Sequence, residues 1–261
     1  MSGAVRSAPR TALSEVGKVF ALGLDVGRNV FKRPFQLKEL IEQLWFIASV
    51  SILPAVLVSM AFGAVISLQL GSLVRQIGAQ SFTGAASVFA NVQQAAPILC
   101  ALLIAGAGGT AICADLGART IREEIDALEV LGISPVQRLV VPRVLAAAIV
   151  AVLLNGLITI VGVAGGYFYN VILQNGTPGA YLAGFSLLAQ PADLVIGAVK
   201  AVSFGIAAGV VAAYRGLNPP PGPKGVGDAV NQSVVISFVL VYLINVVLTT
   251  VYLSVVPPKG G

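Results

Sequence analysis

The residues best suited to chemistry are gathered in one densely charged run, residues 118–145, which lies between long apolar segments. Outside it, Lys200 is the one basic residue well inside an apolar stretch, and Asp115 and Asp193 lie near the ends of such stretches. The chain has no histidine, so the most common general base and metal ligand is missing. It also has no Gly-x-x-x-x-Gly-Lys-[Ser/Thr] phosphate loop, no Ser/His/Asp set and no metal-ligand cluster. We therefore predict that this polypeptide alone is not an enzyme and has no catalytic residue, metal site or cofactor of its own.

The charged run predicts an amphipathic helix over residues 119–131. At about 100° per residue, its apolar and charged side chains fall on opposite sides. The apolar side holds Ile121, Ile125, Leu128 and Leu131, and the charged side holds Arg119, Arg122, Glu123, Asp126 and Glu129. Such a helix is either a solvated loop helix or a docking helix that lies on the bilayer or inserts into a partner. We favour docking.

One carboxylate breaks this pattern. Glu124 projects among the apolar residues, where an unpaired charge would be costly, so we predict a buried contact with Arg119, Arg122 or a partner. The helix should end near Gly132. Ser134 and Gln137 then predict a capping box that starts the next helix.

The composition places these residues in an all-α integral membrane protein. Of 261 residues, 57% are hydrophobic and only 10% are charged, which leaves too little polar surface for a soluble core. Segment 72–94 is less apolar, and we predict a short re-entrant or surface helix there. Five stretches are long and apolar enough to cross a bilayer, at about 44–70, 95–116, 143–173, 193–214 and 232–256.

The N-terminal part of the chain predicts a helix that lies on the membrane surface. Residues 1–12 lack periodicity, and we predict that they are disordered. From residue 13 to 31 the apolar residues share one side, with Leu22 as the exception, and the segment is too polar to span. We take 13–43 as this interfacial helix and its lead-in, and 44–261 as the membrane domain.

Basic residues predict the orientation of the spans. Seven lysines and arginines precede the first span and six more lie in the loops at 118–143 and 215–227, whereas the opposite side carries Arg75 and Lys259. The positive-inside rule therefore predicts a cytoplasmic N-terminus and an extracytoplasmic C-terminus in a plasma membrane. This distribution explains the net charge of +5 as a topological signal, without a nucleic-acid partner.

Polar and small residues inside the spans leave one question open. Lys200 follows Asp193 by seven residues on the same helical face, and it is equally compatible with a functional charge, a structural ion pair or snorkelling. Small residues recur at a spacing of four and predict close helix packing: Ala105 and Gly109, Gly162 and Gly166, Gly205 and Gly209.

Three stretches in this order resemble the MlaE/YrbE permeases of lipid-transporting ABC systems. Residues 123–128, Glu-Glu-Ile-Asp-Ala-Leu, with Gly132, Pro135 and Pro142-Arg143 downstream, resemble the cytoplasmic signature of that family. Residues 97–117, with Ala105-Gly106 and Ala114-Asp115-Leu116-Gly117, resemble its second span, and residues 200–205, Lys-Ala-Val-Ser-Phe-Gly, its fourth. The resemblance covers nearly the whole chain after residue 12.

The resemblance implies a permease dimer on two cytoplasmic ATPase subunits, which hold the ATP and magnesium and engage the 119–131 coupling helix. It also implies a Mce-type lipid carrier outside and a lipid pocket between protomers. Our candidates for the pocket lining are Leu70, Val74, Gln94, Leu243 and Val247.

Two departures refine the subtype that we expect. Gln94 stands where the family usually has Glu, and Ala107 where Arg is common. These differences, with the Ala/Val/Gly-rich composition, favour one of the paired, non-identical YrbE subunits of actinobacterial (mycobacterial) Mce complexes, which import fatty acids or other lipids. An ion-coupled secondary transporter and a non-transporting scaffold are the alternatives. The lipid and the direction of transport stay open at this stage.

Overall fold

The computed structural model describes residues 8–30, 32, 36–76, 83–174, 177–179, 181–183 and 191–255, and within these ranges the chain is almost entirely helical and contains no strand. Five segments of the described chain are long and apolar enough to cross a membrane. The prediction of an all-α integral membrane protein with five spans is therefore confirmed.

The spans are longer than predicted. The first is α2 (Leu37–Gln76), and the second joins α3 (Thr83–Ala90), α4 (Ala96–Leu103) and α5 (Gly109–Ile121) through π-helical turns at Asn91–Ala95 and Ile104–Gly108. The third joins a π-helical turn, Val136–Val140, to α7 (Val141–Tyr167) and a further π-helical turn, Phe168–Leu173. The fourth and fifth are α9 (Pro191–Leu217) and α10 (Gly222–Val255).

The separate helix predicted over residues 72–94 is wrong. Residues 72–76 continue α2, and the chain from Thr83 onward continues the second span, while residues 77–82 lie outside the described residues. Each of the first three spans covers 38 residues. At about 1.5 Å per residue such a helix is about 57 Å long, well beyond the ~30 Å hydrocarbon core of a bilayer. The polar ends that lowered the hydropathy of 72–94 are therefore parts of spans that project from the membrane.

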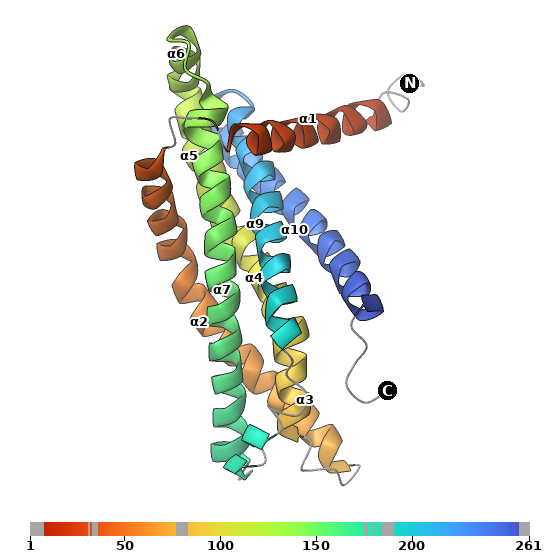
Figure 1. The fold of residues 1–261 in the computed structure, drawn as a ribbon. Helices are drawn as coiled ribbons and strands as arrows, with labels where there is room; N and C mark the ends of the chain where they lie inside the picture. Colours follow the sequence, from red (N-terminus) through yellow and green to blue (C-terminus); the bar gives the residue numbers. More distant parts are fainter. Residues whose placement is uncertain are drawn as a thin grey trace.

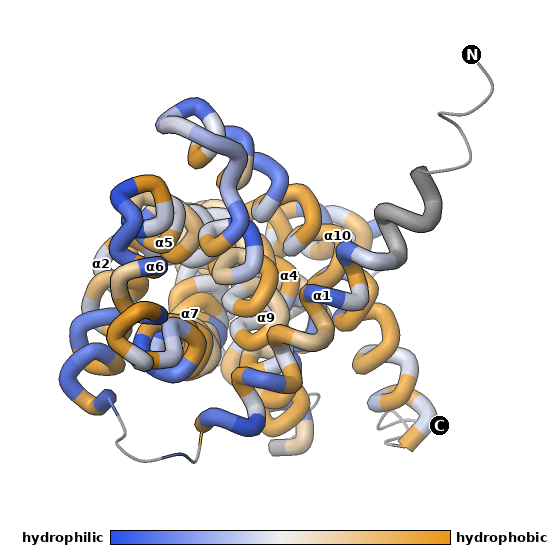
Figure 2. The backbone as a smooth tube through the Cα atoms, turned by 90° about the horizontal axis from the view of Figure 1, so that it is seen from above, coloured by the Kyte–Doolittle hydropathy of each residue, from blue (hydrophilic) through white to orange (hydrophobic). Residues whose placement is uncertain are grey.

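The spans form an elongated bundle, and the short helix α6 and the longer helix α1 lie at one end of it (Figure 1). Helix α2 packs most extensively on α7, α7 packs on α9, and α9 contacts both α5 and α10. Helix α6 covers Glu124–Val130 and helix α1 covers Ala8–Asn29, and α1 extends sideways from the bundle at this end (Figure 1). We call this the α6 end. Seen along the bundle, hydrophilic segments gather around the apolar helices at this end (Figure 2).

Helix α1 has two apolar surfaces, which explains why Leu22 broke the predicted pattern. Leu22 and Val26 pack on the bundle, whereas Val16 and Phe20 are 70% and 68% exposed. The apolar stripe is too wide for one flat contact, so one half packs on the bundle and the other half faces outward, as an interfacial helix requires. Helix α1 begins at Ala8, five residues earlier than expected, so the disorder predicted for 1–12 is wrong for 8–12; residues 1–7 lie outside the described residues.

Glycines allow the spans to pack backbone against backbone. A Cβ on Gly63 of α2 would lie 2.0 Å from the carbonyl oxygen of Gly162 on α7, and one on Gly205 of α9 would lie 2.5 Å from Cα of Ala148. Both distances are too short for any side chain. The close packing predicted from Gly162 and Gly205 is therefore confirmed, and it fixes how the α2, α7 and α9 helices sit together.

A glycine pair tests this packing. We expect Gly63→Ala to lower the free energy of unfolding by about 1–3 kcal/mol, because the backbone of α7 must move to admit the methyl group. Gly156→Ala is the matched control on α7, since a Cβ added there would meet no atom of a neighbouring helix within 4 Å. Thermal unfolding in mild detergent measures both. Equal melting temperatures for the two variants would contradict the packing account.

Candidate functional site: a charged network at a helix break

The predicted 119–131 helix is broken in two, which corrects the sequence-based expectation. Helix α5 ends at Ile121, Glu123 adopts a left-handed conformation with φ of 61°, and α6 begins at Glu124. A left-handed conformation costs a non-glycine residue about 1–2 kcal/mol, so the surrounding structure must hold it. The amide of Glu123 donates to the Thr120 carbonyl oxygen at 3.0 Å, and the Thr120 hydroxyl donates to the carbonyl oxygen of Gly216 on α9 at 3.0 Å. The break is thus anchored to a neighbouring span.

The break divides the predicted coupling residues between elements. Arg119 and Ile121 belong to α5, Arg122 and Glu123 to the break. The remaining predicted residues, Glu124, Ile125, Asp126, Leu128 and Glu129, belong to α6.

The end of α6 follows the predicted signals. Gly132 has φ of +74°, and the amide of Ile133 donates to the Leu128 carbonyl oxygen at 2.9 Å, as in a Schellman motif. Ser134 caps the next helix, because its Oγ accepts from the amide of Gln137 at 3.4 Å. The second half of the predicted capping box is wrong, since the Gln137 side chain donates to the carbonyl oxygen of Lys32.

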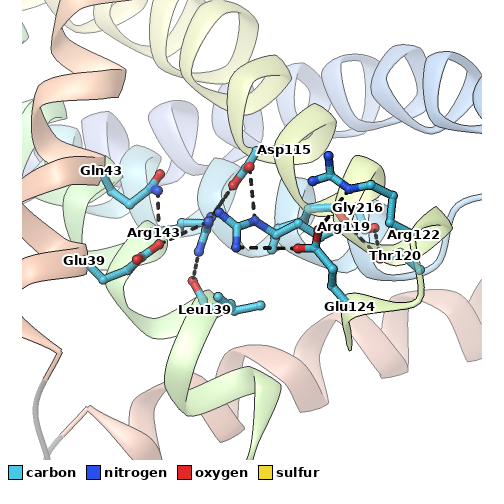
Figure 3. Close-up of polar contacts among 11 residues, drawn as sticks. Glu39, Gln43, Asp115, Arg119, Thr120, Arg122, Glu124, Leu139, Arg143 and Gly216 are labelled. Atoms are coloured by element: carbon cyan, nitrogen blue, oxygen red, sulfur yellow. Dashed lines mark hydrogen bonds and ion pairs between the residues drawn. The ribbon is translucent and has the colours of Figure 1, made fainter. Parts of the chain in front are cut away.

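Below the break lies a network of six charged side chains that starts at Arg143. This arginine is completely buried, and its guanidinium forms ion pairs with Glu39 of α2 at 3.2 Å and with Asp115 of α5, donating from Nε to Asp115 Oδ2 at 3.1 Å (Figure 3). Its Nη1 donates to the carbonyl oxygen of Leu139 at 2.8 Å. A buried guanidinium requires such partners, because an uncompensated charge away from water is very costly. One side chain thus joins α2, α5 and α7.

The network continues from Asp115 to α6. Arg119 donates from Nε to Asp115 Oδ1 at 3.2 Å, and its Nη1 lies 3.9 Å from Glu124 Oε2 (Figure 3). Arg122 approaches the same carboxylate at 3.0 Å. The residues of this series of contacts come from three spans, from the helix break and from α6. We call it the Arg143 network: Glu39, Asp115, Arg119, Arg122, Glu124 and Arg143.

Glu124 therefore pairs with both of the arginines predicted for it, but it is not buried. Its side chain is 44% exposed. The helix break explains this. The spacing of about 100° per residue assumed one continuous helix over residues 119–131, and it therefore gave the Glu124 side chain a direction that it does not have. Sequence reasoning missed Arg143 as a site residue. The available signal was a basic residue at the start of an apolar span, where it must either reach the surface or find an acidic partner such as Asp115.

The tip of α6 exposes apolar and acidic side chains together. Ile125 is buried and Leu128 packs partly on the bundle, as the predicted apolar face required. Leu131 is 73% and the neighbouring Val130 88% exposed, and Ile121 is also exposed, so the predicted face does not act as one surface. The acidic side chains Glu123, Asp126 and Glu129 are exposed around them. A mixed apolar and charged tip of this kind suits contact with another protein.

An apolar cavity lies between α4 and α10, far along the bundle from α6. It has a volume of about 420 Å³. Leu243 is the only predicted pocket residue that lines it. Leu70 and Val74 lie half-buried on α2, and Val247 is exposed on α10. The structure therefore does not bring the predicted set together in one cavity of this chain. The lining is Ile98, Ala101, Leu102, Phe238, Val239, Val241, Tyr242, Leu243 and Asn245.

The fifth predicted pocket residue, Gln94, lines a small polar cavity with Lys200 and Asp193 instead. This cavity holds about 10 Å³, the room of roughly one water molecule. Lys200 is buried and donates to Thr249 Oγ1 on α10 at 2.8 Å, so it does not extend to the membrane surface. Asp193 accepts from Gln93 at 2.8 Å and from the Tyr252 hydroxyl at 2.6 Å. These bonds tie α9 to α10 and to the second span.

The Arg143 network predicts a large loss of stability when its centre is removed. We expect Arg143→Met to lower the free energy of unfolding by about 3–5 kcal/mol, because Asp115 is then left without its buried partner. Arg122→Ala is the control, with an expected change below about 1 kcal/mol, because the Arg122 side chain is 62% exposed.

Thermal unfolding of the purified variants in detergent separates the two expectations. A double variant, Arg143→Met with Asp115→Leu, should be more stable than the sum of the single changes predicts, by about 1 kcal/mol or more. Strictly additive effects would show that the two residues do not act as a pair.

Comparison with known proteins identifies the family. The model of the protein family described as "Permease MlaE" matches residues 40–251 of this chain. The chain is 32% identical to a probable ABC transporter permease protein of Rickettsia prowazekii, over 87% of this chain and 88% of that protein. It is 25% identical to the intermembrane phospholipid transport system permease protein MlaE of Haemophilus influenzae, over 88% and 87% of the two chains. It is also 26% identical to the chloroplastic protein TRIGALACTOSYLDIACYLGLYCEROL 1 of Arabidopsis thaliana, over 78% of this chain and 57% of that protein. With this match over most of its length and five apolar spans, the chain belongs to the MlaE permease family.

Proposed function

We propose that this chain is the membrane-spanning permease subunit of an ATP-driven transporter that moves lipids across a bacterial inner membrane. The observation that carries the proposal is the Arg143 network, which connects α6 to three spans through side-chain contacts. Membership of the MlaE family and the phospholipid transport named for the Haemophilus relative support the lipid substrate.

In this proposal a cytoplasmic ATPase docks on α6. The exposed Val130 and Leu131 supply apolar contact area, and Glu123, Asp126 and Glu129 face basic or polar groups of the ATPase. Closure of the ATPases around ATP and magnesium pushes on α6. Because Glu124 contacts Arg119, and Arg119 contacts Asp115, the displacement passes to Arg143 and so to α2 and α7. The N-terminus and α6 are cytoplasmic, as the positive-inside rule predicts.

The apolar cavity between α4 and α10 is the proposed site for lipid chains. Its lining is almost entirely aliphatic and aromatic, which suits hydrocarbon rather than a polar solute. Because Tyr242 and Leu243 are largely exposed on α10, a second permease protomer can complete the site. Gln94 and Ala107 favour a non-identical second subunit. A Mce-type carrier on the extracytoplasmic side and import of fatty acids are the finer parts of the proposal, and they rest on family resemblance.

A charge reversal tests the docking and coupling part. We expect Glu124→Lys to abolish lipid-stimulated ATP hydrolysis or to release the ATPase. The introduced lysine, Arg119 and Arg122 would then form a group of three cations that repel one another. Glu124→Gln should keep ATPase binding and reduce stimulation less. ATP hydrolysis in reconstituted vesicles measures both. Full lipid stimulation in Glu124→Lys would contradict the proposed route.

Filling the apolar cavity tests the lipid site. We expect Leu102→Trp to reduce copurified lipid several-fold while ATPase binding is unchanged, because the indole occupies the cavity. Leu153→Trp on the outer surface of α7 is the control, since Leu153 is 66% exposed and does not line the cavity. Lipid mass spectrometry on matched preparations measures the outcome. Equal lipid content in both variants would contradict this site.

A further inference from the structure

A polar cleft lies between α6 and the ends of α2 and the third span. Its volume is about 260 Å³. Helices α2 and α5 and the Val136–Val140 turn contribute to it besides α6, so the cleft lies where α6 meets the ends of the first three spans. We call it the α6 cleft, lined by Glu39, Arg119, Glu124, Leu128, Arg138 and Leu139.

The charges around the cleft leave one cation without a partner in the described chain. Glu39 pairs with Arg143, and Glu124 pairs with Arg119 and Arg122. Arg138 is exposed and forms no ion pair with any described residue. The lining itself carries two carboxylates and two guanidiniums, and the rest of the Arg143 network adds one carboxylate and two guanidiniums. The whole group therefore has one net positive charge, and Arg138, at the entrance of the third span, is its cation without an ion-pair partner among the described residues.

The surroundings of the cleft favour an acidic protein side chain over a lipid headgroup. The exposed acidic residues Glu123 at the break and Asp126 and Glu129 on α6 do not line the cleft and present negative charge outward. An anionic membrane surface would be repelled by this charge. A protein partner with a basic contact surface and one inserted carboxylate would match both features. The volume is also below the ~300–1,000 Å³ typical of pockets for drug-sized ligands, and it suits a single side chain better.

We propose that the α6 cleft receives an aspartate or glutamate side chain of the docked ATPase, which forms an ion pair with Arg138. This inference rests on the proposed function and goes beyond it by assigning a second contact. The ATPase would then hold α6 from both sides, with basic groups on its acidic tip and a carboxylate in the cleft behind it. Arg138 would connect the ATPase directly to the start of the third span, bypassing α6.

Charge substitutions at Arg138 test this contact in the full transporter complex. The complex is purified through this chain from cells that express all subunits, and ATPase retention is measured against NaCl concentration. We expect Arg138→Glu to reduce retention about tenfold and Arg138→Gln to reduce it less. The salt dependence of retention should be shallower in Arg138→Gln than in the wild type, because one ion pair is lost. Lys224→Glu is the control, since Lys224 is an exposed cation at the start of α10.

A charge swap identifies the partner group. An ATPase carboxylate found by crosslinking from Arg138→Cys is changed to lysine, and we expect it to restore retention to Arg138→Glu. Unchanged retention in Arg138→Glu, with normal retention by the wild type, overturns this inference alone. Loss of an anionic lipid from Arg138→Glu at unchanged ATPase retention also overturns it. A wild-type chain that retains no ATPase overturns the proposed function itself.

Discussion

The burial of Arg143 is the constraint on which the α6 end depends. A guanidinium in the interior of a membrane bundle must find compensating carboxylates, and here they come from two other spans, Glu39 and Asp115. Because both acids are fixed in place by Arg143, Asp115 also presents its second oxygen to Arg119. The polar contacts then continue to α6. Moving any one of these elements separately would expose a buried charge.

The contacts that hold the spans together differ between the α6 end and the interior of the bundle. At the α6 end, charged contacts join spans that are distant in sequence. Along the membrane interior, glycines such as Gly63 and Gly205 allow close packing of α2, α7 and α9. The fifth span is held differently, by polar contacts such as that between Lys200 and Thr249, and much of its surface faces outward. The exposed surface of α10 is where the proposed second protomer would complete the proposed lipid site.

The sequence predicted the fold class and the span number, because long apolar runs are a strong signal that requires no knowledge of tertiary contacts. The helix break at Glu123 could not be predicted, because a left-handed glutamate is stabilised by Thr120 and by Gly216, which lies far away in sequence. The role of Arg143 depended on the same kind of long-range pairing. Leu22 shows a third case: its angle on the helix was placed correctly, but only the folded bundle shows that one part of the apolar stripe of α1 packs on the spans while the other part faces outward.

The proposed transmission from α6 to the spans requires that α6 and the start of α2 move as one unit. Spin labels at Ala127→Cys and Ile41→Cys test this directly, because both positions are exposed, neither belongs to the proposed ATPase contact, and the native Cys100 and Cys113 are buried. Pulsed electron resonance then gives the distance between them with and without trapped nucleotide. The account predicts one unchanged distance distribution in the wild type and a broader one in Arg143→Met. A nucleotide-dependent shift of this distance in the wild type, with the network intact, would contradict it.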